Sequence, residues 1–139
     1  LPQWLKLNRE LEAAQMPMPI VFAHNDLLPA NFLDDGDRLW LIDFEYAGFS
    51  TAMFDLAGVA SSAGMDAGQA GRLLTTYLEA EPDAAFLRAF EAMQVASLLR
   101  EGMWALVSSL HLSVPGVDYE DYAETNFARM DAALEMIGR

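Results

Sequence analysis

The spacing of apolar residues changes near residue 50, and this change limits the possible folds more than any other feature of the sequence. Before it, short runs rich in β-branched and aromatic residues are separated by turn residues, a pattern typical of strands. After it, apolar residues recur with a period of about 3.6, as in helices that bury one face. We therefore predict an α+β fold that is mostly α, with a small antiparallel strand patch followed by a helical bundle.

Proline, glycine and aspartate residues divide the chain into predicted elements. Helices are predicted over 1–16, 51–63, 66–80, 83–112 and 118–137. Strands are predicted over 20–23, 31–33 and 39–42. We expect the first strand to be buried, because it consists of the apolar run Ile-Val-Phe-Ala, and we expect an Asp-Gly turn to join the other two as a hairpin. The three strands together would form the strand patch.

Composition excludes several classes of function. The chain has 139 residues, which suits one domain, and 53% of them are hydrophobic, too many for a disordered acidic tail. A net charge of −13 would repel a nucleic-acid backbone, so no nucleic-acid partner is expected. The absence of cysteine removes disulfides, thiol catalysis and cysteine zinc sites. The longest apolar stretch contains serines, a histidine and a proline, so no membrane partner is expected.

The N-terminal end suggests a part of a longer protein. The chain begins with Leu1 rather than Met, and its one lysine is Lys6. No basic segment is followed by an apolar stretch, so we expect no signal peptide and a cytoplasmic location.

Polar residues that could take part in catalysis or metal binding lie at the ends of the predicted strands. They are His24, Asp26, Asn31, Asp43 and Glu45. Because the two strands of a hairpin run antiparallel, Asn31 and Asp43 are expected to lie close together. Carboxylate and amide oxygens are ligands that Mg²⁺ prefers when it also binds substrate phosphates.

The same spacing matches a template for phosphoryl transfer, in which an Asp accepts the acceptor's hydroxyl proton, an Asn five residues later binds Mg²⁺, and an Asp before Phe also binds Mg²⁺. Asp26, Asn31 and Asp43 occupy these three positions. The alternative is that these residues only form turns and helix caps, as Asp and Asn often do. Glu45 fits a metal- or substrate-side carboxylate and a solvated loop charge equally well.

Two segments resemble the choline/ethanolamine kinase family, within the aminoglycoside phosphotransferase superfamily and its protein-kinase-like fold. They are His-Asn-Asp-Leu-Leu-Pro-Ala-Asn-Phe-Leu over 24–33 and Leu-Ile-Asp-Phe-Glu-Tyr-Ala over 41–47. The resemblance implies ATP as phosphoryl donor, Asp26 as catalytic base, and Mg²⁺ at Asn31 and Asp43. It places His24 with the catalytic residues, as a buried orienter of the loop. It also implies that Asp55, in Phe-Asp-Leu-Ala, supports the loop by hydrogen bonding.

The same resemblance points to the acceptor. Family members hold a quaternary ammonium in an aromatic pocket formed by the last helices, with a Trp-Gly-x-Trp stretch and a later Tyr. The corresponding residues here are Glu101, Trp104 and Tyr122. Trp and Tyr rings attract a cation, whereas Glu101 replaces an aromatic and weakens the case for choline against a primary amine. Trp104 and Tyr122 as plain core residues remain the alternative.

The resemblance covers 1–139, but only the C-terminal lobe of the family. No glycine-rich phosphate loop is present, and Lys6 precedes every predicted strand, so the N-terminal nucleotide-binding lobe is expected to lie outside this chain. We expect the 139 residues alone to be inactive as a kinase of choline, ethanolamine or a similar cationic alcohol. Three alternatives stay open: an aminoglycoside, thiamine or other small-molecule phosphotransferase, a non-catalytic binding lobe, and an acidic structural domain.

Overall fold

The computed structural model describes residues 2–138, so Leu1 of the first predicted helix lies outside the described residues. The helices are α1 (Pro2–Ala13), α2 (Ala52–Ser62), α3 (Ala67–Leu78), α4 (Ala84–His111) and α5 (Tyr119–Ile137), with a 3-10 turn η1 (Pro29–Asn31). The strands are β1 (Ile20–Ala23), β2 (Phe32–Asp34), β3 (Leu39–Leu41) and β4 (Gly48–Thr51). A mostly helical fold with a small antiparallel strand patch is therefore confirmed.

The strand patch differs from the prediction in its number of strands. Within the described residues, β2 pairs with β3 as the expected hairpin, whereas β1 pairs antiparallel with β4, so that Ala23 lies opposite Gly48 and Ile20 opposite Thr51. The prediction of three strands missed β4, whose residues Gly-Phe-Ser-Thr lack a clear apolar alternation. β4 is a strand because β1, about 28 residues earlier, supplies its hydrogen-bond partners.

The expectation of a buried first strand is wrong. Ile20 and Phe22 are 65% and 66% exposed, and only Ala23 is buried. Side chains alternate between the two faces of a strand, and the helix α2 contacts β1 from one side. On the open face, Phe22 packs edge to face against Phe49 of β4, with ring centroids 6.0 Å apart. The apolar run of β1 therefore does not reveal whether one face or both faces of the strand are covered.

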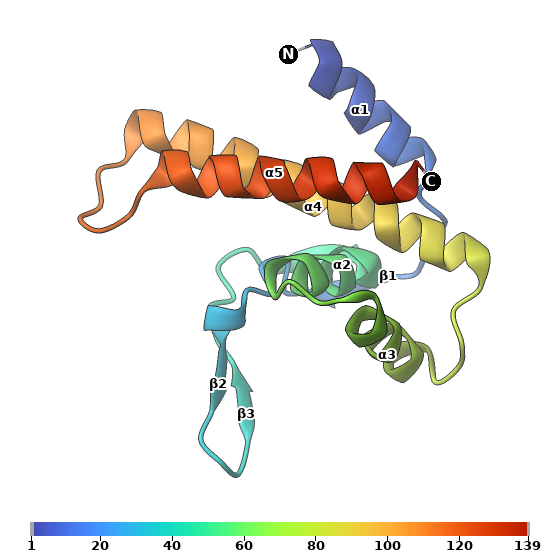
Figure 1. The fold of residues 1–139 in the computed structure, drawn as a ribbon. Coiled ribbons are helices and arrows are strands. Elements are labelled where there is room, and N and C mark those ends of the chain that lie inside the picture. Colours follow the sequence, from blue (N-terminus) through green and yellow to red (C-terminus); the bar gives the residue numbers. More distant parts are fainter. Residues whose placement is uncertain (1, 139) are drawn as a thin grey trace.

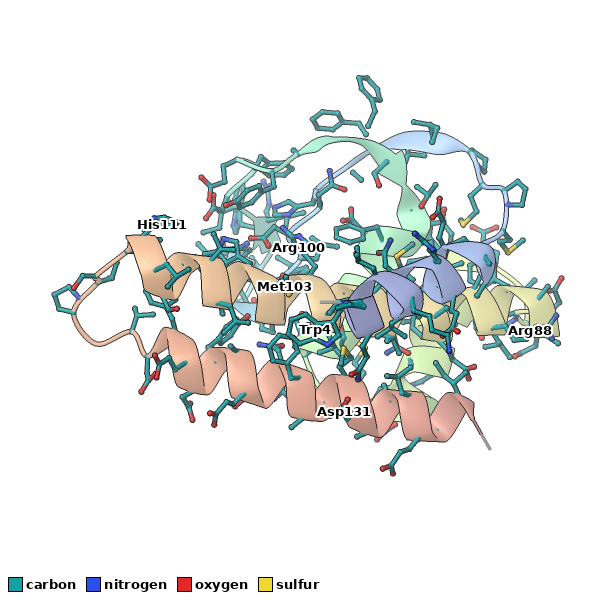
Figure 2. All side chains as sticks on the ribbon, turned by 90° about the horizontal axis from the view of Figure 1, so that it is seen from above. Trp4, Arg88, Arg100, Met103, His111 and Asp131 are labelled. Atoms are coloured by element: carbon teal, nitrogen blue, oxygen red, sulfur yellow. The ribbon has the colours of Figure 1, made fainter. Side chains whose placement is uncertain are left out.

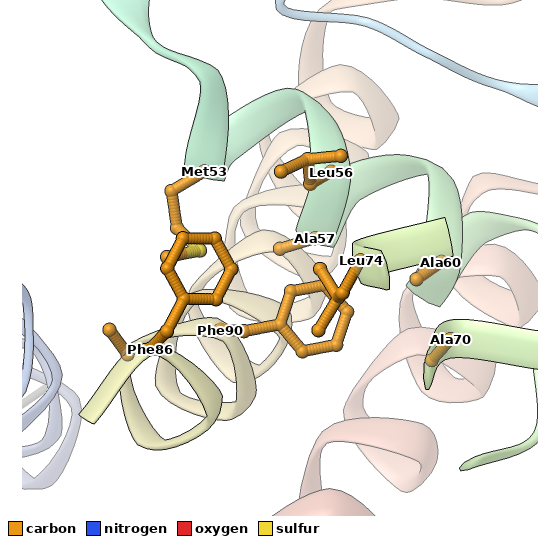
Figure 3. Close-up of a cluster of buried hydrophobic side chains, with 9 residues drawn as sticks. Met53, Leu56, Ala57, Ala60, Ala70, Leu74, Phe86 and Phe90 are labelled. Atoms are coloured by element: carbon orange, nitrogen blue, oxygen red, sulfur yellow. The ribbon is translucent and has the colours of Figure 1, made fainter. Parts of the chain in front are cut away.

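The long helix α4 is the centre of the fold. It contacts α1, α2 and α5, and Figure 1 shows α5 lying alongside it while the β2–β3 hairpin projects away from the helices. One core cluster joins α2, α3 and the start of α4, where Met53, Leu74 and Phe90 pack together (Figure 3). No helix in residues 2–138 has both the length and the apolar content needed to cross a bilayer.

Acidic residues begin the last three helices. Asp66, Asp83 and Asp118 each accept a hydrogen bond from a backbone N–H in the first turn of α3, α4 and α5. Asp66 also forms a capping box with Gln69. Such caps satisfy N–H groups that have no partner inside the helix. Part of the negative charge therefore defines helix starts, close to where the sequence predicts them.

A second core cluster joins α1, α4 and α5, and Gly102 allows α4 and α5 to approach closely within it. A Cβ at Gly102 would lie 2.6 Å from Cε1 of Phe127, closer than atoms can pack. Trp4 of α1 stacks on the same Phe127 ring at 5.1 Å. The pairing of α4 with α5 fixes the positions of Glu101, Trp104 and Tyr122 relative to each other.

Candidate active site

The loop after β1 is held by one carboxylate from α2. Asp55 accepts hydrogen bonds from the backbone N–H of His24, at 2.8 Å, and of Asn25, at 2.7 Å. Asn25 has a left-handed backbone, with φ of 63°, and its side chain donates to the carbonyl of Tyr46. Asn adopts this conformation more readily than most residues. Two charge-assisted bonds from a helix thus set the direction in which the chain enters the segment containing Asp26.

His24 is buried between this loop and the segment that precedes Asp43. Its side chain is 4% exposed, and its Nε2–H donates to the carbonyl of Ile42 at 2.9 Å. Its ring lies 4.7 Å from the ring of Phe44. Nδ1 has no hydrogen-bond partner among the described residues. In this arrangement His24 ties the two predicted catalytic segments together.

The β2–β3 hairpin brings Asn31 beside the segment of Asp43. Phe32 pairs with Leu41, and the N–H of Ile42 donates to the carbonyl of Asn31 at 3.0 Å. Asn31 is buried, and its Nδ2 donates to the carbonyl of Asp26 at 2.9 Å. Asp43 has a left-handed backbone with φ of 64°, which turns the chain away from the hairpin.

The tip of the hairpin is stabilised by its own aspartates. Asp35 accepts hydrogen bonds from the backbone N–H of Asp37 and Arg38 and from the indole of Trp40. These bonds, the indole first, lower the pKa of Asp35. Gly36 adopts a φ of 91°, which only glycine does readily. The Asp-Gly signal therefore forms the turn that sets the register of Asn31 against Ile42.

Asn31 and Asp43 have the chemistry of a magnesium site that is completed by a substrate. The bond from Nδ2 to Asp26 orients the amide of Asn31, and no described residue donates to its Oδ1, which stays available as a ligand. In residues 2–138 no three His, Cys, Asp or Glu side chains cluster as a complete metal site. Mg²⁺ commonly uses one or two carboxylates and takes its other ligands from water and phosphates. The two side chains fit that ion.

A cavity of about 480 Å³ opens between the loop after β1, α2, α4 and α5. Asp26, Asp55, Glu101 and Tyr122 line it together. Five other predicted site residues do not line it: His24, Asn31, Asp43, Glu45 and Trp104. Glu45 is exposed and makes no hydrogen bond or ion pair with the described residues. The cavity thus joins the predicted base to the predicted acceptor-side residues, whereas the predicted metal ligands lie outside it, at the two ends of the hairpin.

The predicted acceptor-side residues form a polar and aromatic group on α4 and α5. The hydroxyl of Tyr122 donates to Oε2 of Glu101 at 3.1 Å. Burial, followed by the charge of Glu101, raises the pKa of Tyr122 to about 12, so the phenol keeps its proton. Trp104 lies edge to face with Tyr122 at 6.4 Å and with Tyr119 at 5.9 Å. Trp104 is 44% exposed and Tyr122 37%, so neither is a core residue.

Sequence reasoning missed two residues of this group, Arg100 and Tyr119. Arg100 forms an ion pair with Glu101 at 2.9 Å and approaches Asp26 at 3.8 Å. The available signal was a single cation directly after the small and apolar residues 96–99 of α4. Tyr119 precedes Tyr122 by one helical turn, a spacing that places both rings on the same side of α5.

Comparison with known proteins gives a consistent result. Residues 3–70 match the model of the choline/ethanolamine kinase family. Protein LicA of Haemophilus influenzae is 31% identical over 117 residues, covering 82% of this chain and 42% of LicA. A probable ethanolamine kinase of Arabidopsis thaliana is 52% identical over 40 residues, or 27% of this chain and 11% of the plant protein.

Solved structures agree with the sequence matches. The crystal structure of a choline/ethanolamine kinase family protein from Mesorhizobium loti superimposes with a TM-score of 0.82 and 29% identity. The match covers 96% of this chain and 45% of that protein. This chain therefore spans less than half the length of these relatives.

Proposed function

Because this chain belongs to the choline/ethanolamine kinase family, we propose that its protein transfers the γ-phosphate of ATP to the hydroxyl of an amino alcohol such as choline or ethanolamine. In this proposal, residues 1–139 are the C-terminal, acceptor-binding lobe, and a further lobe binds the nucleotide. One observation carries the proposal: Asp26 shares a cavity with Glu101 and Tyr122, and its loop is hydrogen-bonded to the hairpin of Asn31 and Asp43.

Asp26 acts as the base in this proposal. Its side chain is 15% exposed at the cavity wall, where an acceptor hydroxyl can reach it, and its backbone carbonyl is held by Asn31. His24 and Asp55 fix the loop from two sides, so that the carboxylate needs little reorganisation. In phosphoryl transfer the protein side chains position the reactants and remove the hydroxyl proton, because no covalent nucleophile is needed.

Asn31 and Asp43 would hold Mg²⁺, with Glu45 as a nearby carboxylate on the metal or substrate side. When bound, the ion supplies positive charge that neutralises the phosphates. The two residues are in position before the ion binds. The carbonyl of Asp26 orients the amide of Asn31, and the left-handed backbone at the end of the hairpin sets the position of Asp43.

The acceptor is a small cation. Trp104 and Tyr122 present aromatic surface beside the carboxylate of Glu101, and both kinds of group attract an ammonium. A carboxylate also accepts hydrogen bonds from a primary ammonium, which a trimethylammonium cannot donate. We therefore expect ethanolamine to be a better acceptor than choline.

The proposal is tested with the protein encoded by the complete gene. ADP release is measured with Mg²⁺–ATP and four acceptors: ethanolamine, choline, an aminoglycoside and thiamine. We expect turnover with the amino alcohols and a loss of at least about 10²-fold in kcat for Asp26→Asn. Arg72→Gln, an exposed substitution on α3, is the control and should leave kcat unchanged.

Two outcomes would contradict the proposal. Turnover of the aminoglycoside or thiamine alone would assign the protein to another phosphotransferase, and no turnover together with no binding of Mg²⁺–ATP would indicate a non-catalytic lobe. Steady turnover by the 139-residue chain alone, abolished by Asp26→Ala, would show that no further lobe is required.

A further inference from the structure

Arg100 lies at the acceptor cavity in an arrangement that none of the roles above uses. It comes from α4, and Figure 2 shows it on the side of that helix that faces the loop region, whereas Arg88 lies near the start of the helix. Its Nη1 is 3.8 Å from Oδ1 of Asp26, the proposed base. A fixed cation beside the base is unexpected in a pocket meant for a cationic acceptor, so its surroundings require an explanation.

The guanidinium of Arg100 is held on several sides. Oε1 of Glu101 accepts from Nη1 at 2.9 Å, and the other oxygen of Glu101 accepts from Tyr122. The guanidinium carbon also lies 5.7 Å from the ring of Tyr46 and 5.5 Å from the ring of Phe54. The groups that contact the guanidinium come from the loop before β4, from α2 and from α4 itself. Because Arg is a long and flexible side chain, contacts from three segments indicate a preset position.

Most donors of Arg100 remain free for a ligand. A guanidinium has five N–H groups, and within the described residues a hydrogen bond to Glu101 is formed through Nη1. The 3.8 Å separation from Asp26 is too long for a hydrogen bond. The side chain is 36% exposed and lines the cavity. An Arg fork with free donors matches the oxygens of a phosphoryl group in geometry and charge.

We propose that Arg100 donates hydrogen bonds to the phosphoryl group while it is transferred beside Asp26, and that Glu101 positions Arg100 for this task. This inference rests on the proposed function. In the step, the acceptor's hydroxyl oxygen bonds to the γ-phosphorus as the bond from that phosphorus to the β–γ bridging oxygen breaks. ADP leaves with that electron pair, and the hydroxyl proton passes to Asp26. Arg100 keeps its protons throughout and stabilises charge on the oxygens of the transferred group.

Kinetics of the protein from the complete gene test this inference. For Arg100→Gln we expect kcat to fall by about 10²-fold or more, while KM for the amino alcohol changes by less than about threefold. Arg100→Lys keeps the charge without the fork and should recover part of kcat. Glu101→Gln should lower kcat by less than Arg100→Gln does. The control is Arg88→Gln, an exposed substitution on the same helix, which should leave both parameters unchanged.

A binding measurement separates this inference from the proposed function. Phosphoethanolamine and ethanolamine are titrated calorimetrically into the wild-type protein and Arg100→Gln. We expect the substitution to weaken phosphoethanolamine at least about tenfold, as the loss of a charged hydrogen bond does, and to leave ethanolamine within about twofold.

Each result then decides one of the two ideas. If wild-type protein phosphorylates no alcohol, the proposed function fails, and phosphoethanolamine binding that depends on Arg100 still supports a phosphoryl contact there. Equal binding of phosphoethanolamine by Arg100→Gln and wild type would overturn the inference. It would also be overturned by an Arg100→Gln protein whose KM rises while its kcat is unchanged, because Arg100 would then serve acceptor binding alone.

Discussion

Replacing Asp55 tests how the loop after β1 is held. Its two carboxylate oxygens accept from the N–H groups of His24 and Asn25, at 2.8 and 2.7 Å. Asp55→Ala removes both acceptors and leaves the N–H groups of His24 and Asn25 without this partner, facing the space that the carboxylate filled. Asp55→Asn keeps one acceptor and turns an NH₂ group toward the second N–H.

The size of the effect follows from these two bonds. A hydrogen bond to a charged group contributes about 1.5–3 kcal/mol, and the partial exposure of Asp55 favours the lower end. We expect Asp55→Ala to lower the free energy of unfolding by about 3 kcal/mol and Asp55→Asn by about half of that. With a urea m-value of about 1.5 kcal/mol/M, the alanine variant should unfold about 2 M earlier.

Urea unfolding followed by circular dichroism measures both variants. Asp131→Ala on α5 (Figure 2) is the control, because Asp131 is exposed and its side chain makes no hydrogen bond with the described residues. Its effect should stay within about 0.5 kcal/mol. A loss below about 0.5 kcal/mol for Asp55→Ala would refute the reasoning, since the loop would then be held without this carboxylate.

Two further substitutions test the α4–α5 pair. Gly102→Ala should lower the free energy of unfolding by about 1–3 kcal/mol, because the new Cβ meets the ring of Phe127; an unchanged melting temperature would contradict the close approach. Tyr122→Phe should flatten the pH dependence of stability at high pH. In the wild type, the unfolded phenol ionises near its ordinary value of about 10 while the folded one keeps its proton to about 12, so stability falls across that window. Equal slopes of unfolding free energy for both proteins there would refute this.

The sequence predicted the helices and strands more completely than it predicted which of them pack or pair with each other. Helices α2 to α5 begin within one residue of their predicted starts. For α3, α4 and α5 the reason is that Asp66, Asp83 and Asp118 are local caps, whose effect needs no distant contact. The β2–β3 hairpin was likewise predicted from its Asp-Gly turn. By contrast, β4 was missed and the burial of β1 was wrong, because both depend on segments that are distant in the sequence.

The candidate site also has a part that the sequence indicates and a part that only the tertiary structure shows. The order and spacing of His24, Asp26, Asn31 and Asp43 by themselves indicated phosphoryl-transfer chemistry, since a short loop and a hairpin bring such residues together through local geometry. The tertiary structure decided where Arg100 lies, because its partners Asp26, Tyr46 and Phe54 reach it from three other parts of the chain. Local backbone rules determine which side chains share a turn or a strand end. Helix packing determines which charges meet across a cavity, and that information is spread over the whole sequence.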